Sequence, residues 1–209
     1  MIALFDVDTR QIKNTGGWGY MPRSQPYREG VERLLHVAQE HGVPTVTSTC
    51  VNGNMLGQST FSALNADVLF VPMADDDLAW RARVHEFGNY FVEKGRRPAG
   101  TPFDPANNKA ELFRYNPNID RLIDELAIAE WIVFGNAMDT CVNRVVANFV
   151  ARGYRISYIP ELMIPSTKCG DCDPEVFKQH VYDRWHAQGI RPMPLASAVG
   201  RLATATATV

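Results

Sequence analysis

The sequence lacks the features that mark several large classes of protein. No apolar run approaches the roughly 20 residues of a membrane-spanning helix. The formal net charge is −2, so no basic excess favours nucleic acid. Four cysteines in 209 residues do not suggest a disulfide scaffold, and residues 1–6 do not resemble a secretory signal. We therefore expect a cytoplasmic protein with free thiols and with neither membrane nor nucleic-acid partners.

Internal repeats, a linker that would mark a domain boundary and a GxxxxGK[ST] phosphate loop are also absent. The glycines of the segment 13–25 therefore serve turns, and its Trp18 and Tyr20 are candidates for the wall of a pocket. A chain of this length suits one α/β domain. We expect a single domain over residues 1–209, with about 200–209, rich in Ala and Thr, as a frayed tail.

The segment 131–153 predicts a strand, a tight turn and a helix. Its apolar run 131–134 is typical of a strand buried on both faces of a parallel sheet. Gly135 permits the turn, and Asp139 or Thr140 is a suitable helix N-cap. Cys141 then lies in the first helical turn, where unpaired N–H groups favour a thiolate and can hold an oxyanion. At this point Cys141 is either a nucleophile or a small buried hydrophobic residue.

Apolar strands alternate with amphipathic helices along the rest of the chain, which predicts a three-layer α/β/α sandwich with a six-stranded, mainly parallel sheet. The expected strands are 2–5, 43–49, 68–71, 89–94, 131–134 and 154–159, the last ending at Pro160. The expected helices are 27–41, 78–87, 117–126, about 141–152 and about 174–185.

Three chemically active side chains each follow an expected strand: Asp6, Lys94 and Cys141. If the strands are parallel, their carboxyl ends meet at one edge of the sheet, where α/β proteins bind ligands. A thiol needs a base to remove its proton and a cation to stabilise the thiolate, and the Asp and the Lys could supply them. Charged residues are also common at strand ends, so spacing alone leaves the catalytic interpretation open.

The sequence around these three residues resembles that of the isochorismatase-like cysteine hydrolases, a family that includes nicotinamidases, N-carbamoylsarcosine amidases and ureidoacrylate amidases. The similarity covers about residues 1–185. Leu4-Phe5-Asp6-Val7 is similar to the family's strand with the catalytic Asp, and Phe91-Val92-Glu93-Lys94 to the strand with the catalytic Lys. The segment 135–142, GNAMDTCV, resembles the nucleophile turn G-x-x-T-[DE]-x-C-V.

The resemblance implies a catalytic triad of Asp6, Lys94 and Cys141. It also implies a cis peptide between Asn136 and Ala137, and an oxyanion hole formed by the N–H groups of Ala137 and Cys141. Met138 stands where the family usually has Thr, and we add it to Trp18 and Tyr20 as a candidate for the substrate pocket.

Two further departures limit what the resemblance implies. Asp8 stands where the family usually has Gln, two residues after the catalytic Asp. Nicotinamidases carry a metal-binding Asp-x-His after the second strand, where this chain has Cys50-Val51-Asn52. We therefore expect no metal and no cofactor, and a substrate other than nicotinamide. Isochorismatases proper need no nucleophile at position 141, so Cys141 favours hydrolysis of a C–N bond.

Cys169 and Cys172 form a CxxC pair in a loop. Such a pair can be redox-active or half of a zinc site, which Cys50 and His180 could join in space, but an isolated CxxC is a weak signal.

The sequence thus predicts a cysteine-dependent hydrolase of a small amide, ureido or carbamoyl compound, acting through a thioester and forming a homo-oligomer, dimer or tetramer. The alternatives are a vinyl ether hydrolase of the isochorismatase type, or a non-catalytic thiol protein working through Cys169 and Cys172.

Overall fold

In the described part of the chain, seven strands form one sheet in the order β3-β4-β2-β1-β5-β6-β7, and every pair of neighbours is parallel. The structure is a computed structural model and describes residues 1–9, 25–48, 68–72, 78–92, 116–166 and 173–205. The strands are β1 (Ile2–Val7), β2 (Thr45–Ser48), β3 (Leu69–Val71), β4 (Asn89–Val92), β5 (Glu130–Asn136), β6 (Arg155–Ile164) and β7 (Arg191–Pro192).

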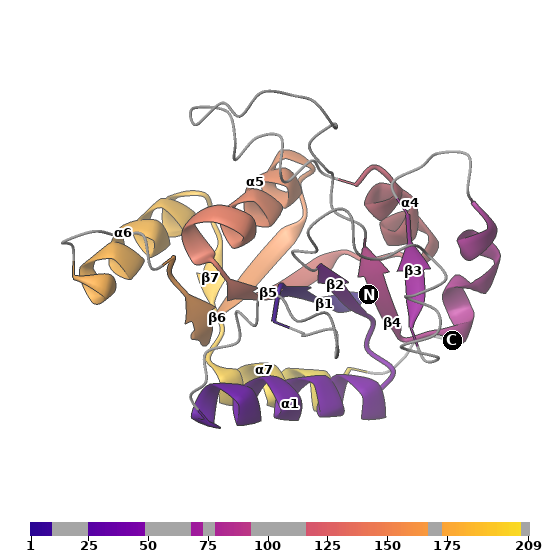
Figure 1. Cartoon of the computed structure of the whole chain (residues 1–209), viewed down its shortest axis with the longest axis horizontal. Coiled ribbons are helices and arrows are strands. Elements are labelled where there is room, and N and C mark those ends of the chain that lie inside the picture. Colours follow the sequence, from indigo (N-terminus) through magenta and orange to yellow (C-terminus); the bar gives the residue numbers. More distant parts are fainter. Residues whose placement is uncertain (10–24, 49–67, 73–77, 93–115, 167–172, 206–209) are drawn as a thin grey trace, which may run out of the picture.

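Helices cover both faces of this sheet (Figure 1). The helical elements are α1 (Gln25–Glu40), η1 (Ala79–Glu86), α4 (Asn118–Glu125), η2 (Met138–Val142), α5 (Asn143–Ala151), α6 (Pro174–Ala187) and α7 (Leu195–Ala203). Helices α1 and α7 lie together on one face, and α4, α5 and α6 lie on the other. The three-layer α/β/α sandwich predicted from the sequence is therefore confirmed.

Two hydrophobic cores fill the spaces between the layers. In β1, Leu4 packs toward α1 and α7, whereas Phe5 packs toward α5, because alternate residues of a strand point to opposite faces. Both are buried, as expected for a strand covered on both sides. Phe5, Trp131 and Phe149 form an aromatic cluster in which the Trp131 and Phe149 rings stack with centroids 4.7 Å apart. This cluster fixes β1, β5 and α5 relative to one another.

The expected elements all occur, with differences at their ends and in type. The sheet has seven strands rather than six, because the two-residue β7 carries no periodicity. Strand β6 continues past Pro160 to Ile164, because its register with β5 shifts between Val133 and Gly135 and a bulge tolerates a residue without N–H. The helix expected at 78–87 is the 3₁₀ helix η1.

The prediction that about 200–209 forms a frayed tail was wrong for its first residues. Helix α7 extends to Ala203, and its Ala198 and Leu202 are fully buried against α1 and the sheet. Leu195, Ala198 and Leu202 recur at i, i+3 and i+7, a helical spacing that the surrounding Ala and Thr residues conceal. Residues 206–209 lie outside the described part of the chain.

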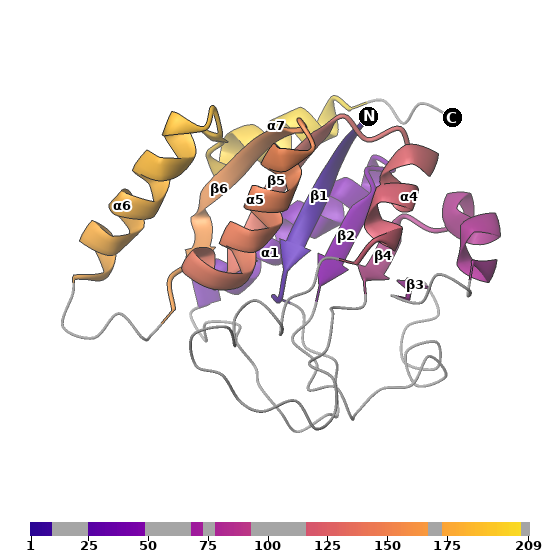
Figure 2. The same ribbon diagram turned by 90° about the horizontal axis from the view of Figure 1, so that it is seen from above.

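The arrangement of helices creates a switch point in the middle of the sheet. The next helix described after β1 is α1, on one face, whereas β5 is followed by α5, on the opposite face, although the two strands are neighbours. The views in Figures 1 and 2 show α1 and α5 on opposite sides of these strands. Ligands of α/β proteins bind beyond the carboxyl ends of strands at such a point. We therefore expect a functional site at the carboxyl ends of β1 and β5.

Candidate active site at the carboxyl ends of β1 and β5

Asp6 lies at the carboxyl end of β1, beside β5. The register pairs Asp6 with Phe134 and Val7 with Gly135. Cys141 follows five residues after Asn136, the last residue of β5, within the turn η2. The fold therefore brings the termini of these two strands to one edge and places the expected base and the expected nucleophile there.

The carboxylate of Asp6 is completely buried and is hydrogen-bonded to Thr9. Thr9 donates to Oδ1 of Asp6 twice, from its hydroxyl at 2.5 Å and from its main-chain N–H at 3.2 Å. Thr9 is itself 1% exposed. Sequence reasoning missed Thr9; the signal was a hydroxyl residue three positions after an Asp that ends a strand, a spacing at which side chains bond to the nearby main chain.

Asp8 connects the ends of three strands. Its φ of +58° is uncommon for a residue other than glycine, and Asn and Asp tolerate it best. Its Oδ1 accepts a hydrogen bond from Ser48 Oγ on β2 at 3.2 Å. Its main-chain carbonyl accepts one from Asn136 Nδ2 on β5, also at 3.2 Å. Asp8 thus joins β1, β2 and the end of β5, where the turn that carries Cys141 starts.

The turn that carries Cys141 begins with an unusually close approach of two strands. Gly135 has φ +125°, and a β-carbon at this position would lie 2.1 Å from the carbonyl oxygen of Val7. The next peptide bond, Asn136–Ala137, is cis, at the bond where the family resemblance places one. The carbonyl of Ala137 then accepts hydrogen bonds from the N–H groups of Thr140 at 3.0 Å and Val142 at 3.1 Å. These bonds close the turn around Cys141.

This turn is π-helical and starts earlier than the sequence indicates. Ala137, rather than Asp139 or Thr140, occupies the N-cap position, and no side chain caps it. Asp139 instead points to the residues after β6: its Oδ1 accepts from the N–H of Ser166 and its Oδ2 from Ser166 Oγ, both at 2.7 Å. The expected N-cap was therefore wrong, because a partner 27 residues away takes the Asp139 carboxylate.

Cys141 is buried, with 7% of its surface exposed. The hydroxyl of Thr140 lies 3.9 Å from its sulfur, within the range of a long hydrogen bond to sulfur, and 3.4 Å from the carbonyl of Ala137. Cys141 belongs to the same hydrophobic core as Met138, which is fully buried. It lies within η2, close to the amino-terminal end of α5, where the helix dipole places partial positive charge.

Tyr27 on α1 is a second residue that sequence reasoning missed. Burial, and then the negative charge of Asp6, raise the pKa of Tyr27 well above its usual value, because both disfavour the phenolate. Its hydroxyl donates to the carbonyl of Leu162 at 3.3 Å. Tyr27 also lines a cavity of about 390 Å³ together with Leu162, Ile164, Pro165 and Leu195. Apolar spacing marked the face of α1, but nothing in that spacing singled out Tyr27.

Several predicted site residues lie outside the described part of the chain. They are Lys94, Trp18, Tyr20, and the cysteines Cys50, Cys169 and Cys172. Among the described residues, no group of three His, Cys, Asp or Glu side chains could hold a metal ion. The roles of Lys94, the pocket residues and the CxxC pair, and the expected independence from metal, therefore remain predictions.

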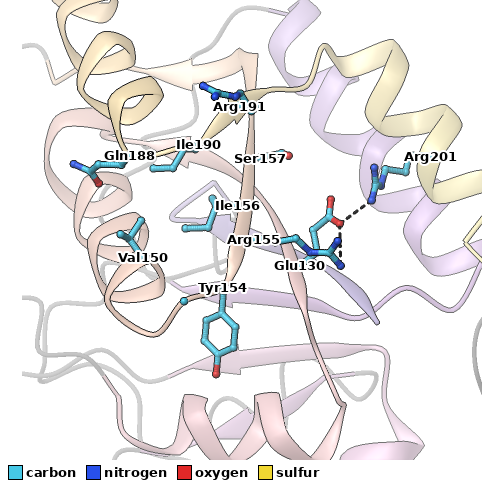
Figure 3. A pocket seen from close by; sticks show the side chains of 12 residues that line it. Glu130, Val150, Tyr154, Arg155, Ile156, Ser157, Gln188, Ile190, Arg191 and Arg201 are labelled. Carbon is cyan, nitrogen blue, oxygen red and sulfur yellow. Dashed lines mark hydrogen bonds and ion pairs between the residues drawn. The ribbon is translucent and has the colours of Figure 1, made fainter.

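A larger cavity, of about 500 Å³, lies at the opposite end of the strands (Figure 3). Its charged residues are Glu130, at the start of β5, and Arg155, Arg191 and Arg201. Glu130 is 8% exposed and accepts from Arg201 at 2.7 Å. The carboxyl-terminal ends of α5 and α6 border the cavity at Gly153 and Gln188. The partial negative charge of these helix ends offsets part of the positive charge of the arginines. None of the predicted site residues that the structure describes lines this cavity.

No helix among the described residues is long and apolar enough to cross a lipid bilayer.

Comparisons with known proteins give matches in structure only. No protein-family model matches the sequence, and no curated protein matches it.

The structural matches extend over nearly the whole chain. A cysteine hydrolase from Pseudomonas syringae pv. phaseolicola 1448A superposes with a TM-score of 0.60 at 11% identity, over 96% of this chain and 92% of the other. A putative isochorismatase from Burkholderia xenovorans LB400 superposes with a TM-score of 0.58 at 15% identity, over 98% of this chain and 88% of the other. N-carbamoylsarcosine amidase from Thermoplasma acidophilum superposes with a TM-score of 0.51 at 16% identity, over 93% of this chain and 96% of the other.

Identities this low establish a shared architecture and no more. This shared architecture agrees with the fold that the resemblance in sequence implies. The chain has the isochorismatase-like fold.

Proposed function

We propose that this chain is a cysteine-dependent hydrolase that cleaves a C–N bond in a small amide, ureido or carbamoyl compound. The observation that carries the proposal is the position of Cys141 on a helix-initiating turn after β5, at the sheet edge where the buried carboxylate of Asp6 lies one residue before the end of β1. The fold shared with a cysteine hydrolase and with N-carbamoylsarcosine amidase supports the same class of reaction.

The first half of the reaction forms a thioester. Asp6 removes the proton from Cys141 as the sulfur attacks the carbonyl carbon, forming a C–S bond and moving the π electrons to oxygen. The N–H groups of Ala137 and Cys141 would stabilise this oxyanion, and Lys94 would favour the thiolate. When the oxyanion collapses, the C–N bond breaks, and the leaving ammonia or amine takes the proton held by Asp6.

The second half releases the acid and restores the thiol. Water loses a proton to Asp6 as its oxygen attacks the thioester carbonyl. The second tetrahedral intermediate collapses with cleavage of the C–S bond, and the departing sulfur recovers a proton from Asp6. The cycle consumes one water and needs neither a metal nor an oxidant.

A panel of small amides, ureides and carbamoyl compounds, assayed for release of ammonia or amine, tests this proposal. Cys141→Ala should abolish turnover on every active compound, whereas Cys169→Ala and Cys172→Ala should leave it within about two-fold. Mass spectrometry of the quenched enzyme should show an acyl adduct on Cys141. Turnover of a vinyl ether that survives Cys141→Ala would indicate the isochorismatase type of reaction instead. Loss of function confined to the Cys169 and Cys172 variants would indicate a thiol or metal-binding protein.

A further inference from the structure

The hydrogen bonds between Thr9 and Asp6 restrict the way in which Asp6 can act. Both donors of Thr9 go to the same oxygen, Oδ1. A carboxylate oxygen has two lone-pair sites, and these two bonds fill them. If Asp6 is the base of the reaction, these bonds favour Oδ2 as the oxygen that exchanges protons.

The same two bonds define the orientation of the carboxylate. Asp6 is 0% exposed and Thr9 1% exposed, so water does not compete for Oδ1. Thr9 is β-branched and therefore has few χ1 rotamers, which limits the movement of its hydroxyl. The left-handed conformation of Asp8 turns the chain between the two residues and brings Thr9 back toward the Asp6 side chain. The segment 6–9 is thus a short loop that closes on the carboxylate.

We propose that Thr9 is the positioning residue of the catalytic carboxylate, holding Oδ1 of Asp6 so that Oδ2 is presented to the thiol and the substrate. This inference rests on the proposed function, because it assigns a partner to the base of that reaction. Thr9 acts through Asp6 and takes no proton itself. Its two donated bonds also favour the charged carboxylate over the protonated acid.

The neighbouring strand provides a matched control. Thr47 on β2 is the register partner of Asp6, so its side chain projects from the same face of the sheet. Thr47 is 0% exposed as well, yet its hydroxyl has no hydrogen-bond partner among the residues that the structure describes. Valine has nearly the same shape as threonine, so Thr→Val keeps the packing at both positions. Only at position 9 does the substitution remove a hydrogen bond to Asp6.

The experiment compares Thr9→Val, Thr9→Ser and Thr47→Val, using the best substrate of the panel and the rate of Cys141 alkylation by iodoacetamide as a readout that needs no substrate. We expect Thr9→Val to lower kcat roughly 10- to 100-fold with a change in KM below about three-fold, since small misplacements of a catalytic group cost this much. The acid limb of the rate–pH profile should move to higher pH. Thr9→Ser should recover activity to within about five-fold of the wild type, and Thr47→Val should match the wild type.

A double-mutant cycle distinguishes positioning from a general loss of structure. In an Asp6→Ala background there is no carboxylate to position, so Thr9→Val should change the alkylation rate by less than about two-fold. An equal effect in both backgrounds, or a Thr9→Val enzyme with wild-type kcat and pH profile, would overturn the inference. If Asp6→Ala itself alters neither hydrolysis nor alkylation, the proposed function fails instead, which is a separate outcome.

Discussion

The carbonyl oxygen of Val7 occupies the space in which a side chain on Gly135 would have to begin. The two residues are register partners on β1 and β5, and a β-carbon on Gly135 would lie 2.1 Å from that oxygen. This contact joins the strand that carries Asp6 to the turn that carries Cys141. Only glycine combines the missing β-carbon with the φ of +125° found there.

Gly135→Ala should therefore destabilise the protein strongly. We expect a loss of about 3 kcal/mol or more in the free energy of unfolding, because strained backbone and overpacking act together. Urea denaturation followed by circular dichroism measures it. The control is Gly200→Ala: Gly200 is in helix α7 with nothing within 4 Å of the added β-carbon. That variant should be neutral or stabilised by up to about 1 kcal/mol. Similar stabilities for the two variants would contradict the close contact.

The reactivity of the thiols gives a second prediction. Cys141 should be the most rapidly alkylated of the four cysteines near neutral pH, because a helix N-terminus and a nearby Lys94 would both favour its thiolate. Brief treatment with limiting iodoacetamide, followed by peptide mass spectrometry, gives the order of labelling. Because Cys141 is only 7% exposed, unfolded protein serves as the reference for equal access. Preferential labelling of Cys50, Cys169 or Cys172 in the folded protein would count against a nucleophilic Cys141.

The sequence predicted the elements whose pattern is local. The apolar run 131–134, Gly135 and the helical spacing after Cys141 identified β5, the turn and α5, because each signal lies within about ten residues of the element it marks. The π-helical start of the turn was not predictable in this way, because the carboxylate of Asp139 bonds to Ser166 beyond β6. The hydrogen bonds from Thr9 to Asp6 were also hidden, since they depend on the left-handed turn at Asp8.

The contact between Asp139 and Ser166 yields a third prediction. Asp139→Ala and Ser166→Ala should each destabilise the protein by about 1–3 kcal/mol, as expected for hydrogen bonds to a charged acceptor. The effects should be less than additive, with a coupling of about 1 kcal/mol or more in a double-mutant cycle. Asp139→Ala should also slow alkylation of Cys141, because it releases the turn from the end of β6. Full additivity would show that the two side chains do not interact in solution.

Buried tyrosines predict how stability depends on alkaline pH. Burial raises the pKa of Tyr90 to about 12, and its hydroxyl contacts the carbonyls of Val84 and Phe87. The unfolded chain releases this proton near pH 10, so its stabilising effect is complete below pH 10 and is lost as the pH rises toward 12. Tyr90→Phe cannot ionise. Its deficit in unfolding free energy relative to the wild type should therefore shrink by about 1–2 kcal/mol between pH 9 and 11.5. Parallel pH curves for the two proteins would be inconsistent with a raised pKa.

The last prediction concerns the division of labour between Asp6 and Lys94. Asp6→Asn keeps the shape of the side chain and removes the base, so kcat should fall by roughly two to four orders of magnitude, the usual contribution of general base catalysis. KM should change much less. Lys94→Met keeps the bulk and removes the cation, so it should act through the thiol, raising the pKa of Cys141 and shifting the pH dependence of alkylation upward.

Because these groups would serve one proton transfer, the double variant should be little worse than the poorer single variant. Steady-state kinetics of all four proteins at several pH values separates the two effects. The variant Tyr90→Phe, which removes a hydroxyl that contacts only the carbonyls of Val84 and Phe87 among the printed partners of that side chain, serves as the control for general loss of structure. If the two losses instead multiply, Asp6 and Lys94 act independently, and a concerted triad is the wrong description of this active site.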